Sequence, residues 1–317
     1  MLKILYAAGN RIGAHFQLKR FLQSIQHKNY IIKTAAFKKS LGDLDVDYML
    51  DSLLNFTNPE EISFNGNYSY YSNEIKRFAP DLIISDFEVY TSTIALELNI
   101  KLWQFSPINL YYGINNDVKY NLGIHKNYFF LLDSSPKRNG YILNLLNNSN
   151  RRFVLSHIGD SKYNNIISDN YEWVRPNFIL GDGSKKIDYF LALSKTNKII
   201  INELKNKNSL LFSSFTLEHF DDLKIENLLE EDQIKEHIEN CKYFISDGTA
   251  TFAADAFYNQ KYNIAYPRYD DIESVITSMV NKYCNFGCIS NNFNQSNKIE
   301  IELNEKIKFI SEYLGEL

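Results

Sequence analysis

Residues 242–287 decide the fold, and they read KYFISDGTATFAADAFYNQKYNIAYPRYDDIESVITSMVNKYCNFG. The stretch opens with a short apolar run, Tyr243–Ile245, whose aromatic and β-branched residues are typical of a buried strand. Polar residues interrupt this pattern at Ser246–Thr249, and small and apolar residues then recur at helical spacing over Thr251–Phe257. A second short run, Tyr262–Tyr266, ends at a proline and has the composition of another strand. The stretch therefore predicts a strand, a polar turn, a helix and a second strand, which is the βαβ unit of a parallel sheet.

The polar turn of this unit lies where a strand ends and a helix begins. In an open parallel sheet, backbone N–H groups at this position hold phosphate-bearing ligands. Asp247, Gly248, Thr249 and Thr251 are therefore candidate ligand-binding residues, because N–H and hydroxyl groups neutralise a diphosphate without many basic side chains. The alternative is an ordinary helix cap, which is the most frequent use of Ser, Thr and Asp at such a place.

The segment SDGTATFAADAF, followed by a strand, a proline and an acidic stretch, resembles the nucleotide-sugar-binding segment of GT-B glycosyltransferases. The resemblance extends to the cell-wall N-acetylglucosaminyltransferase group and the UDP-glycosyltransferases. In those proteins a Gly-rich turn contacts the diphosphate, and a Glu in the following helix holds the ribose. The resemblance implies that Gly248, Thr249 and Thr251 form the turn. It also places Asp255, one methylene shorter than Glu, at the ribose.

Asp270, Asp271 and Glu273 follow the proline, where related transferases have acidic or amide residues that contact sugar hydroxyls. Paired carboxylates also suggest a divalent-metal site, but the spacing provides no further ligands. A solvated acidic loop is the other alternative. Since GT-B enzymes usually need no metal, the resemblance predicts no metal site and no cofactor besides a nucleoside-diphosphate sugar as the donor substrate.

The bulk composition sets limits on the partners. The chain has 317 residues, enough for two domains, and 44% hydrophobic and 23% charged residues are typical of a globular protein. A net charge of −4 provides no overall field for nucleic acid or an anionic membrane. No apolar run has the length of a transmembrane segment or a signal peptide, and three cysteines form no disulfide framework. These features predict a cytoplasmic protein without a transmembrane segment; a homodimer is an open possibility.

The amino terminus predicts a second Rossmann-like start. A buried strand, Leu2–Ala8, leads into the turn Gly9–Ala14, and a helix follows from about His15. The turn GNRIGAH differs from the dinucleotide-binding pattern, so on its own it is weak evidence of a dinucleotide site. Gly9 and Asn10 are nevertheless expected to contribute to ligand binding.

His15 is the candidate general base, since an imidazole titrates near neutral pH. The resemblance implies that this first turn approaches the acceptor and carries a catalytic His. Asp86, at the end of another predicted strand, is expected to orient His15 and stabilise its protonated form, and Glu88 is a substitute base. The alternative is an exposed histidine at the start of a helix.

The domain boundary is expected at Gly181–Lys186, which is polar and broken by two glycines. The predicted domains are 1–183, on the acceptor side, and 184–317, which binds the nucleotide sugar and ends in a helix that crosses back. Ser194, Lys195 and Thr196 form the first turn of the second domain, where Lys195 supplies positive charge to a leaving diphosphate. The alternative for this turn is an ordinary surface loop. An acidic segment, Glu226–Asn240, is expected to be helical.

The sequence thus predicts an α/β protein with two Rossmann-like, doubly wound domains that face each other across a cleft, the GT-B architecture. The resemblance implies an enzyme that transfers a sugar from a nucleoside-diphosphate donor to an acceptor hydroxyl. The expected donor is a uridine diphosphate sugar, and the expected acceptor is a saccharide, a lipid-linked molecule or a small molecule. The alternatives are a non-hydrolysing nucleotide-sugar 2-epimerase and a catalytically inactive GT-B-like binding protein.

A modified DNA base as the acceptor, as in phage glycosyltransferases, is a minor hypothesis. Basic side chains are its only support, and the acidic net charge opposes it. These side chains are Lys19, Arg20, Arg138, Arg151 and Arg152.

Overall fold

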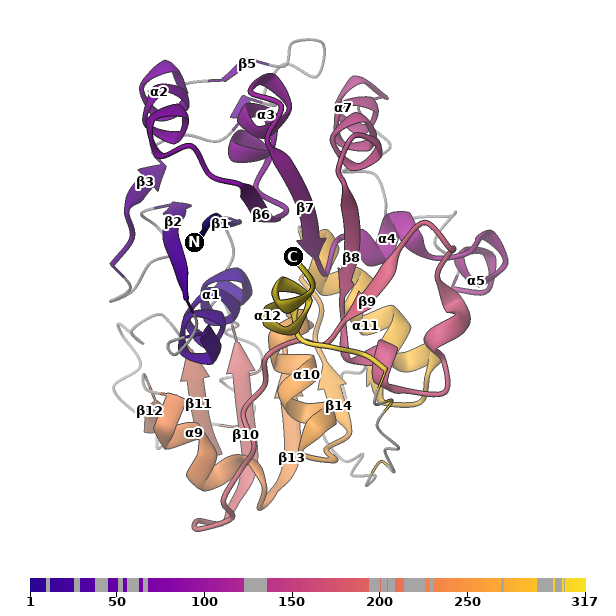
Figure 1. The fold of residues 1–317 in the computed structure, drawn as a ribbon. Helices are drawn as coiled ribbons and strands as arrows, with labels where there is room; N and C mark the ends of the chain where they lie inside the picture. The colour runs from indigo at the N-terminus through magenta and orange to yellow at the C-terminus, as the bar shows by residue number, and fades with distance from the viewer. Residues whose placement is uncertain are drawn as a thin grey trace. The chain divides into compact units, whose positions relative to one another are not determined.

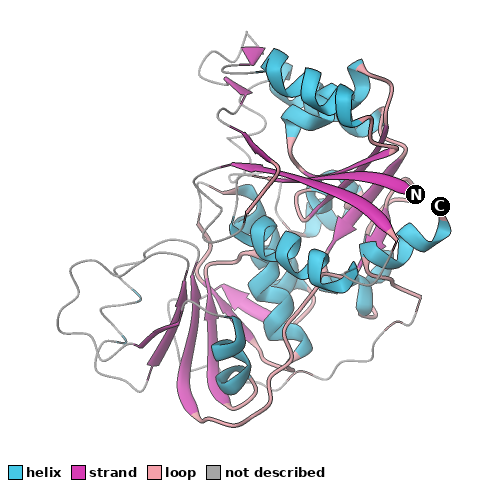
Figure 2. Ribbon diagram, turned by 60° about the vertical axis from the view of Figure 1, so that its left-hand side comes forward, coloured by secondary structure: helices cyan, strands magenta, loops and turns pink. Residues whose placement is uncertain are grey.

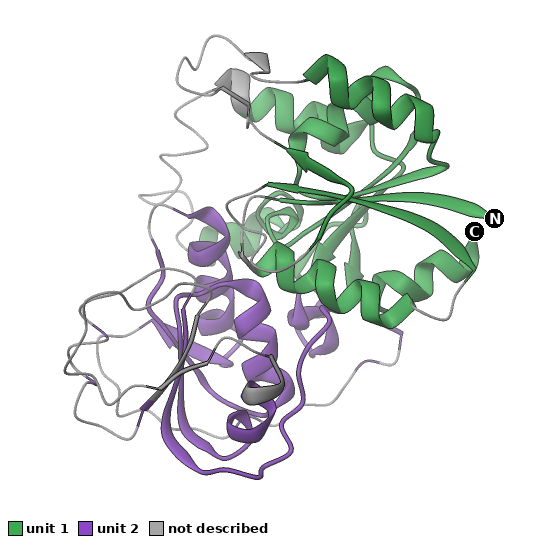
Figure 3. Ribbon diagram, turned by 90° about the vertical axis from the view of Figure 1, so that its left-hand side faces the viewer, with its two compact units in different colours: residues 1–155, 166–174, 308–317 green, residues 156–165, 175–307 purple. Residues whose placement is uncertain are grey.

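The structure is a computed structural model, and it describes most of the chain (Figure 1). The described residues are 1–9, 12–25, 29–37, 45–50, 54–55, 63–64, 68–122, 136–193, 200, 204, 209–213, 226–228, 231–268, 271–289, 299, 304 and 306–317. They form two compact units, coloured separately in Figure 3. Unit 1 comprises residues 1–155, 166–174 and 308–317, and unit 2 comprises residues 156–165 and 175–307. The chain therefore leaves and re-enters unit 1 before the boundary that the sequence predicts between residues 183 and 184.

Unit 1 contains a parallel sheet of seven strands. In spatial order they are β3 (Tyr48–Leu50), β2 (Tyr30–Phe37), β1 (Leu2–Ala8), β6 (Leu82–Asp86), β7 (Lys101–Ser106), β8 (Arg151–Leu155) and β9 (Glu172–Val174). The chain builds the sheet outward from β1 to β3 and then returns to add β6 beside β1, which makes the gap between β1 and β6 a topological switch point. A separate antiparallel pair is formed by β4 (Leu54–Asn55) and β5 (Ser63–Phe64).

Strand β1 shows why the sheet of unit 1 lies between two layers of helices (Figure 2). Ile4, Tyr6 and Ala8 belong to one buried cluster, and Leu5 and Ala7 belong to another. Alternate residues of a strand point to opposite faces, so a continuous apolar run requires cover on both faces.

Two sets of helices provide this cover. On one face, α1 (Ile12–Ile25) and α12 (Ile310–Tyr313) contribute to the cluster of Ile4, and on the other face α2 (Tyr68–Phe78) and α3 (Val89–Glu97) contribute to the cluster of Leu5. The other helices that the structure describes in unit 1 are α4 (Asn109–Gly113), α5 (Asn116–Asn121) and α7 (Pro136–Asn147), with a 3-10 turn at Leu314–Glu316. The helix α12 also contacts α1, so the last residues of the chain complete the core of unit 1.

Unit 2 contains a second parallel sheet, of six strands. In spatial order they are β12 (Glu226–Leu228), β11 (Ser209–Ser213), β10 (Ile187–Leu193), β13 (Cys241–Ser246), β14 (Asn263–Ala265) and β15 (Gly287–Ile289). The helices whose bounds the structure describes are α9 (Glu231–Ile238), α10 (Ala250–Tyr258) and α11 (Ile272–Tyr283). A 3-10 turn at His157–Asp160 also belongs to this unit, and another, Asn164–Ile166, spans its boundary with unit 1. Within the unit, the first strand lies between the second and the fourth, which is the doubly wound order with its switch point between β10 and β13.

The predicted α/β class with two doubly wound parallel sheets is confirmed. One expected element differs, because Glu226–Leu228 is not helical and pairs as β12 with Leu210–Phe212. The part of this acidic segment that the structure describes as helical is α9, Glu231–Ile238. Residues 226–228 are extended because they pair with the upstream strand β11. The spacing of residues within the acidic segment does not reveal this pairing, so it cannot predict the strand.

Two general findings concern the whole described chain. No helix in the described ranges has the length and hydropathy needed to cross a bilayer. All three cysteines are free, with Cys241 and Cys284 buried and Cys288 partly buried.

Candidate functional site

The candidate site lies at the carboxyl end of β13, beside the switch point of the sheet in unit 2. Asp247, Gly248 and Thr249 form the turn between β13 and α10, as the sequence predicts. The neighbouring strand at the switch point is β10, and the residues that follow it include Ser194, Lys195 and Thr196. These three predicted site residues lie outside the described ranges.

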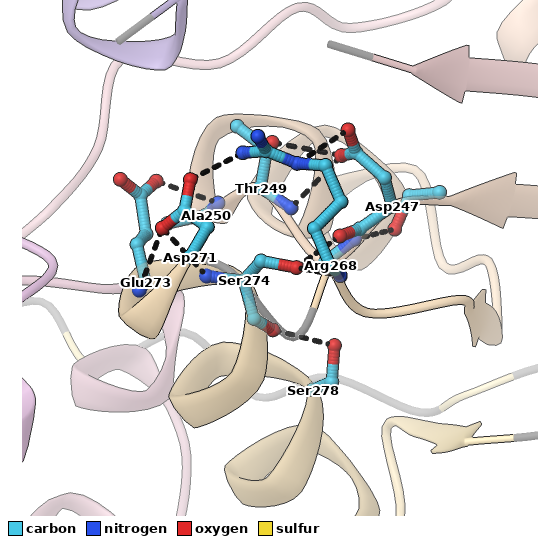
Figure 4. Close-up of polar contacts among 10 residues, drawn as sticks. Asp247, Thr249, Ala250, Arg268, Asp271, Glu273, Ser274 and Ser278 are labelled. Carbon is cyan, nitrogen blue, oxygen red and sulfur yellow. Dashed lines mark hydrogen bonds and ion pairs between the residues drawn. The ribbon is translucent and has the colours of Figure 1, made fainter. Parts of the chain in front are cut away.

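Asp247 is the centre of a hydrogen-bonded turn (Figure 4). Its Oδ1 accepts hydrogen bonds from the Thr249 hydroxyl at 2.8 Å and from the Thr249 N–H at 3.3 Å. Its Oδ2 lies 3.3 Å from the Nε of Arg268. Because Asp247 is buried, these partners are needed to offset the loss of hydration of its carboxylate. The side chain therefore holds the turn and Arg268 together.

Gly248 is required by its neighbours within unit 2. Its φ is +81°, a left-handed conformation that favours glycine. An added Cβ would lie 2.5 Å from the Ser274 carbonyl oxygen and 2.3 Å from the Ser278 hydroxyl, both on α11. The resemblance implies that Gly248 belongs to a turn that contacts the diphosphate, whereas the close approach in the structure is between Gly248 and α11.

Arg268 is the residue that the sequence analysis misses. It follows the proline after β14, forms ion pairs with Asp247 and Asp271, and has a side chain that is 18% exposed. Its backbone N–H donates to the Ser274 hydroxyl at 2.7 Å, and this hydroxyl donates to the Asp247 carbonyl. The sequence feature that could have indicated Arg268 is its position directly after Pro267, the proline that ends the second strand of the βαβ unit. Such a position places a cation at the same sheet edge as the turn after β13.

Asp271 is the N-cap of α11. Its Oδ1 accepts from the Glu273 N–H at 2.9 Å and from the Ser274 N–H at 3.5 Å, and its Oδ2 pairs with Arg268. Asp270 lies outside the described ranges. Among the residues that the structure describes, no group of three or more His, Cys, Asp or Glu side chains is arranged to hold a metal ion.

Glu273 performs for α10 the role that Asp271 performs for α11. Its Oε1 accepts from the Ala250 N–H at 3.1 Å, and Ala250 is the first residue of α10 (Figure 4). The Thr249 side chain forms no capping hydrogen bond, so Glu273 supplies the acceptor at this helix end. Thr251, another predicted ligand residue, lies buried in the first turn of the same helix.

Asp255 is buried in the second turn of α10, and its Oδ1 accepts from the Ile179 N–H at 2.9 Å. Asn259 then donates to the Ile179 carbonyl at 2.7 Å and accepts from the Gly181 N–H at 2.8 Å. Phe178 stacks on Tyr258 with ring centroids 3.7 Å apart. Residues 178–181 therefore form a strap that is bound along α10. The sequence instead predicts that Asp255 contacts the ribose and that a linker between the domains begins at Gly181.

The predicted acceptor-side residues lie at the switch point of the sheet in unit 1. Gly9 follows β1, Asp86 ends β6, and Ala8 and Asp86 are direct partners in the parallel register. Asn10 lies outside the described ranges. His15 belongs to the first turns of α1, and its side chain is buried with 6% exposed, which contradicts the alternative of an exposed histidine.

The burial of His15 controls its protonation. Neither ring nitrogen has a hydrogen-bond partner among the described residues, Asp86 included. Burial lowers the pKa of His15 from 6.5 to about 4, because the charged imidazolium loses hydration. The imidazole is therefore neutral at pH 7 and able to accept a proton.

Glu88, the substitute base, is the N-cap of α3. Its carboxylate accepts from the Tyr90 N–H at 2.7 Å and from the Thr91 N–H and hydroxyl, both at 2.6 Å. Burial raises the pKa of Glu88 to about 6, and the hydrogen bonds from Thr91 and Tyr90 oppose this rise. These contacts give the carboxylate a structural role in the turn after Asp86.

Comparison with known proteins gives similarity in structure only. No protein-family model and no curated protein matches the sequence. Among solved structures, the spinosyn forosaminyltransferase SpnP is similar with a TM-score of 0.58 and 9% identity, over 93% of this chain and 87% of that one. The glycosyltransferase SsfS6 of Streptomyces sp. SF2575, complexed with thymidine diphosphate, has a TM-score of 0.60 and 10% identity, over 91% and 87% of the two chains.

A protein with another activity is also similar. The putative UDP-N-acetylglucosamine 2-epimerase of Listeria monocytogenes has a TM-score of 0.53 and 8% identity, over 83% of this chain and 78% of that one. At such identities the likeness establishes the fold and leaves the reaction open. Two parallel sheets of doubly wound order, matched over most of the chain by these glycosyltransferases, show that the protein has the GT-B fold.

Proposed function

We propose that the protein is a glycosyltransferase that moves a sugar from a nucleoside-diphosphate donor to an acceptor hydroxyl. One observation carries this proposal. In a GT-B fold, the edge beside the switch point of the second sheet holds a polar network in which Asp247 and Thr249 are buried and Arg268 and Asp271 are partly buried. Doubly wound sheets bind ligands at this edge, and the similar SsfS6 structure contains thymidine diphosphate.

The donor would bind at the turn after β13. Arg268 retains donor capacity, because a guanidinium has five N–H groups and its ion pairs engage the Nε and one terminal nitrogen. The Nε of Arg268 is close to Asp247 but forms no hydrogen bond with any described residue. We assign Arg268 to the diphosphate, and Asp270 and Asp271 to the sugar hydroxyls. Ser194, Lys195 and Thr196 would add contacts from the turn after β10.

The acceptor would be activated by His15. As the bond from the sugar C1 to the donor phosphate breaks, a bond forms between C1 and the acceptor oxygen, whose proton passes to the neutral imidazole of His15. Asp86 would stabilise the imidazolium that results. The leaving nucleoside diphosphate takes the electrons of the broken bond, and its charge would be stabilised by Arg268. No metal and no further cofactor is part of this proposal, and activity that persists in EDTA would support this view.

Calorimetric titration tests the donor site. The ligands are the diphosphates of uridine, thymidine, guanosine, cytidine and adenosine, followed by their sugars. We expect selective binding to one base, weakened at least tenfold in Arg268→Gln, because a charged hydrogen bond is worth about 1.5–3 kcal/mol. Arg77→Gln is the matched control, since Arg77 also pairs with a carboxylate but lies on α2 in unit 1 with a side chain that is 77% exposed.

Two results would count against the proposal. Absence of binding to every nucleotide would favour an inactive GT-B-like protein, and equal losses in Arg268→Gln and Arg77→Gln would remove Arg268 from the site. Thermal unfolding of both variants separates lost binding from lost folding.

The 2-epimerase is the second candidate, because a putative epimerase is among the similar structures. UDP-N-acetylglucosamine incubated with the protein alone separates the two, since an epimerase converts the sugar without an acceptor and a transferase does not. We further propose that the protein acts in the cytoplasm and that a homodimer is compatible with this function. The proposed acceptor is a saccharide, a lipid-linked molecule or a small molecule, and DNA has the least support.

A further inference from the structure

The starts of α10 and α11 are both occupied by carboxylates of the chain itself. Asp271 accepts hydrogen bonds at the start of α11, and Glu273 accepts the Ala250 N–H at the start of α10. Figure 4 shows Glu273 beside Asp271 and reaching toward Ala250. The sequence predicts that the start of α10 holds a ligand phosphate. In the structure, its first N–H group is already bound to an anion.

The position of Glu273 stabilises its negative charge. Its side chain comes from the first turn of α11 and ends at the first residue of α10, so it lies near the positive ends of two helices. The residue is 3% exposed, which reduces screening of its charge by water and salt. A phosphate oxygen at α10 would accept from the same N–H group and would gain from the same helix dipole. The carboxylate and a phosphate thus compete for one place.

The nearby charges increase this competition. Asp247, Asp271 and Glu273 bring three carboxylates to this turn, and Arg268 pairs with Asp247 and Asp271. A diphosphate adds further negative charge to the same buried surroundings. Binding at this turn therefore improves when one carboxylate moves away or loses its charge.

We propose that Glu273 is an internal competitor that sets the phosphate affinity of the donor site, so that a bound diphosphate must displace its carboxylate from the Ala250 N–H. This inference rests on the proposed function, because it concerns the diphosphate of the donor. It makes Glu273 a specificity-determining residue and leaves the chemical step to other groups.

The test is a titration of wild type, Glu273→Gln and Glu273→Asp with three probes: inorganic pyrophosphate, uridine diphosphate and uridine. Gln keeps an oxygen that can accept from Ala250 but removes the charge, whereas Asp keeps the charge but is shorter by one methylene. We expect pyrophosphate and uridine diphosphate to bind about tenfold more tightly to Glu273→Gln, with a smaller gain in Glu273→Asp. Uridine has no phosphate, so its affinity should not change.

Glu312→Gln is the matched control. Glu312 accepts from the Phe309 N–H at 2.7 Å at the start of α12, in unit 1, so this substitution removes a similar capping charge far from the donor site in sequence and outside its unit. It should leave all three affinities unchanged. In turnover, Glu273→Gln should lower KM for the donor more than it changes kcat, which a general loosening of the fold would not do.

The outcomes distinguish this inference from the proposed function. Pyrophosphate affinity that stays the same or falls in both Glu273 variants overturns the internal competitor, even if uridine diphosphate binds. A parallel change in uridine affinity would also overturn it, because the effect would not depend on phosphate. If pyrophosphate affinity rises while no nucleotide binds to any variant, the competitor stands and the nucleotide-dependent function fails.

Discussion

At the scale of the residue, Gly248 shows how backbone geometry and packing fix one position. Its φ of +81° and the 2.5 Å approach of the Ser274 carbonyl to an added Cβ both exclude other residues. We expect Gly248→Ala to lower the free energy of unfolding by about 2–4 kcal/mol, measured by urea denaturation. The reason is a strained φ combined with a backbone contact that cannot yield.

Gly140→Ala is the control for this prediction. Gly140 lies within α7, and an added Cβ there has no neighbour within 4 Å. The substitution should be neutral or stabilise by up to about 1 kcal/mol, because alanine is the better helix former. Equal effects of the two substitutions would show that packing against α11 does not determine Gly248.

The candidate site was predictable where the chemistry lies within one short stretch. Asp247, Gly248 and Thr249 lie in the turn that the pattern of Tyr243–Phe257 predicts. Arg268 and Glu273 reach the same turn from the next loop and helix, so only the folded sheet reveals their contacts. Sequence patterns report neighbours along the chain, whereas these contacts join residues 21 and 23 positions apart, from Asp247 to Arg268 and from Ala250 to Glu273.

At the scale of the element, the strap at residues 178–181 assigns a structural role to Asp255. Asp255→Ala would leave the Ile179 N–H buried without an acceptor. We expect a loss of about 1–3 kcal/mol in the free energy of unfolding, whether or not a nucleotide is present. Thermal unfolding without uridine diphosphate measures the loss of stability, and the additional stabilisation on adding uridine diphosphate measures whether nucleotide binding is retained.

A different outcome would restore the role that the resemblance implies. If Asp255→Ala keeps its stability and loses only nucleotide affinity, the carboxylate serves the ribose. Asp182→Ala is the control, since Asp182 accepts from the nearby Ser184 N–H in an exposed turn and should affect neither quantity.

Strands and helices with continuous apolar patterns were predictable, and short sheet elements were not. The strand Leu2–Ala8 and the helix of Phe21 follow from apolar spacing alone. Strand β9 has only three residues and β12 begins with an acidic one, so their pairing partners define them. The same non-local pairing explains why the unit boundary differs from the glycine-rich segment at 181–186, which lies bound to α9 through Asp182 and Lys185.

At the scale of the whole molecule, each unit contains a buried histidine that opposes protonation. Burial lowers the pKa of His15 in unit 1 and of His157 in unit 2 from 6.5 to about 4. Between pH 6.5 and about pH 4, these histidines bind protons in the unfolded chain but not in the folded chain, so the free energy of unfolding falls as the pH falls. We expect each histidine to reduce the free energy of unfolding by about 2 kcal/mol between pH 7 and pH 5, measured by urea denaturation.

His157→Gln isolates the contribution of unit 2. The His157 Nε2 lies 2.7 Å from the Asn281 Oδ1, and a Gln side chain can also donate a hydrogen bond to that oxygen. The variant should lose less stability than wild type on the same change of pH. An unchanged difference between pH 7 and pH 5 would show that His157 is protonated without cost in the folded state.

The chain passes between the units at residues 155/156, 165/166, 174/175 and 307/308. This connectivity determines the order in which the two units can fold during synthesis. A ribosome releases the whole of unit 2 before it releases Ile310, Tyr313 and Leu314, which belong to the buried cluster of β1 and α1. Until then, the first unit has an incomplete core and exposes apolar surface, a state that chaperones recognise. Unit 1 therefore cannot complete its core before residues 310–314 have been synthesised, and a fragment of residues 1–174 would require residues 308–317 supplied as a peptide.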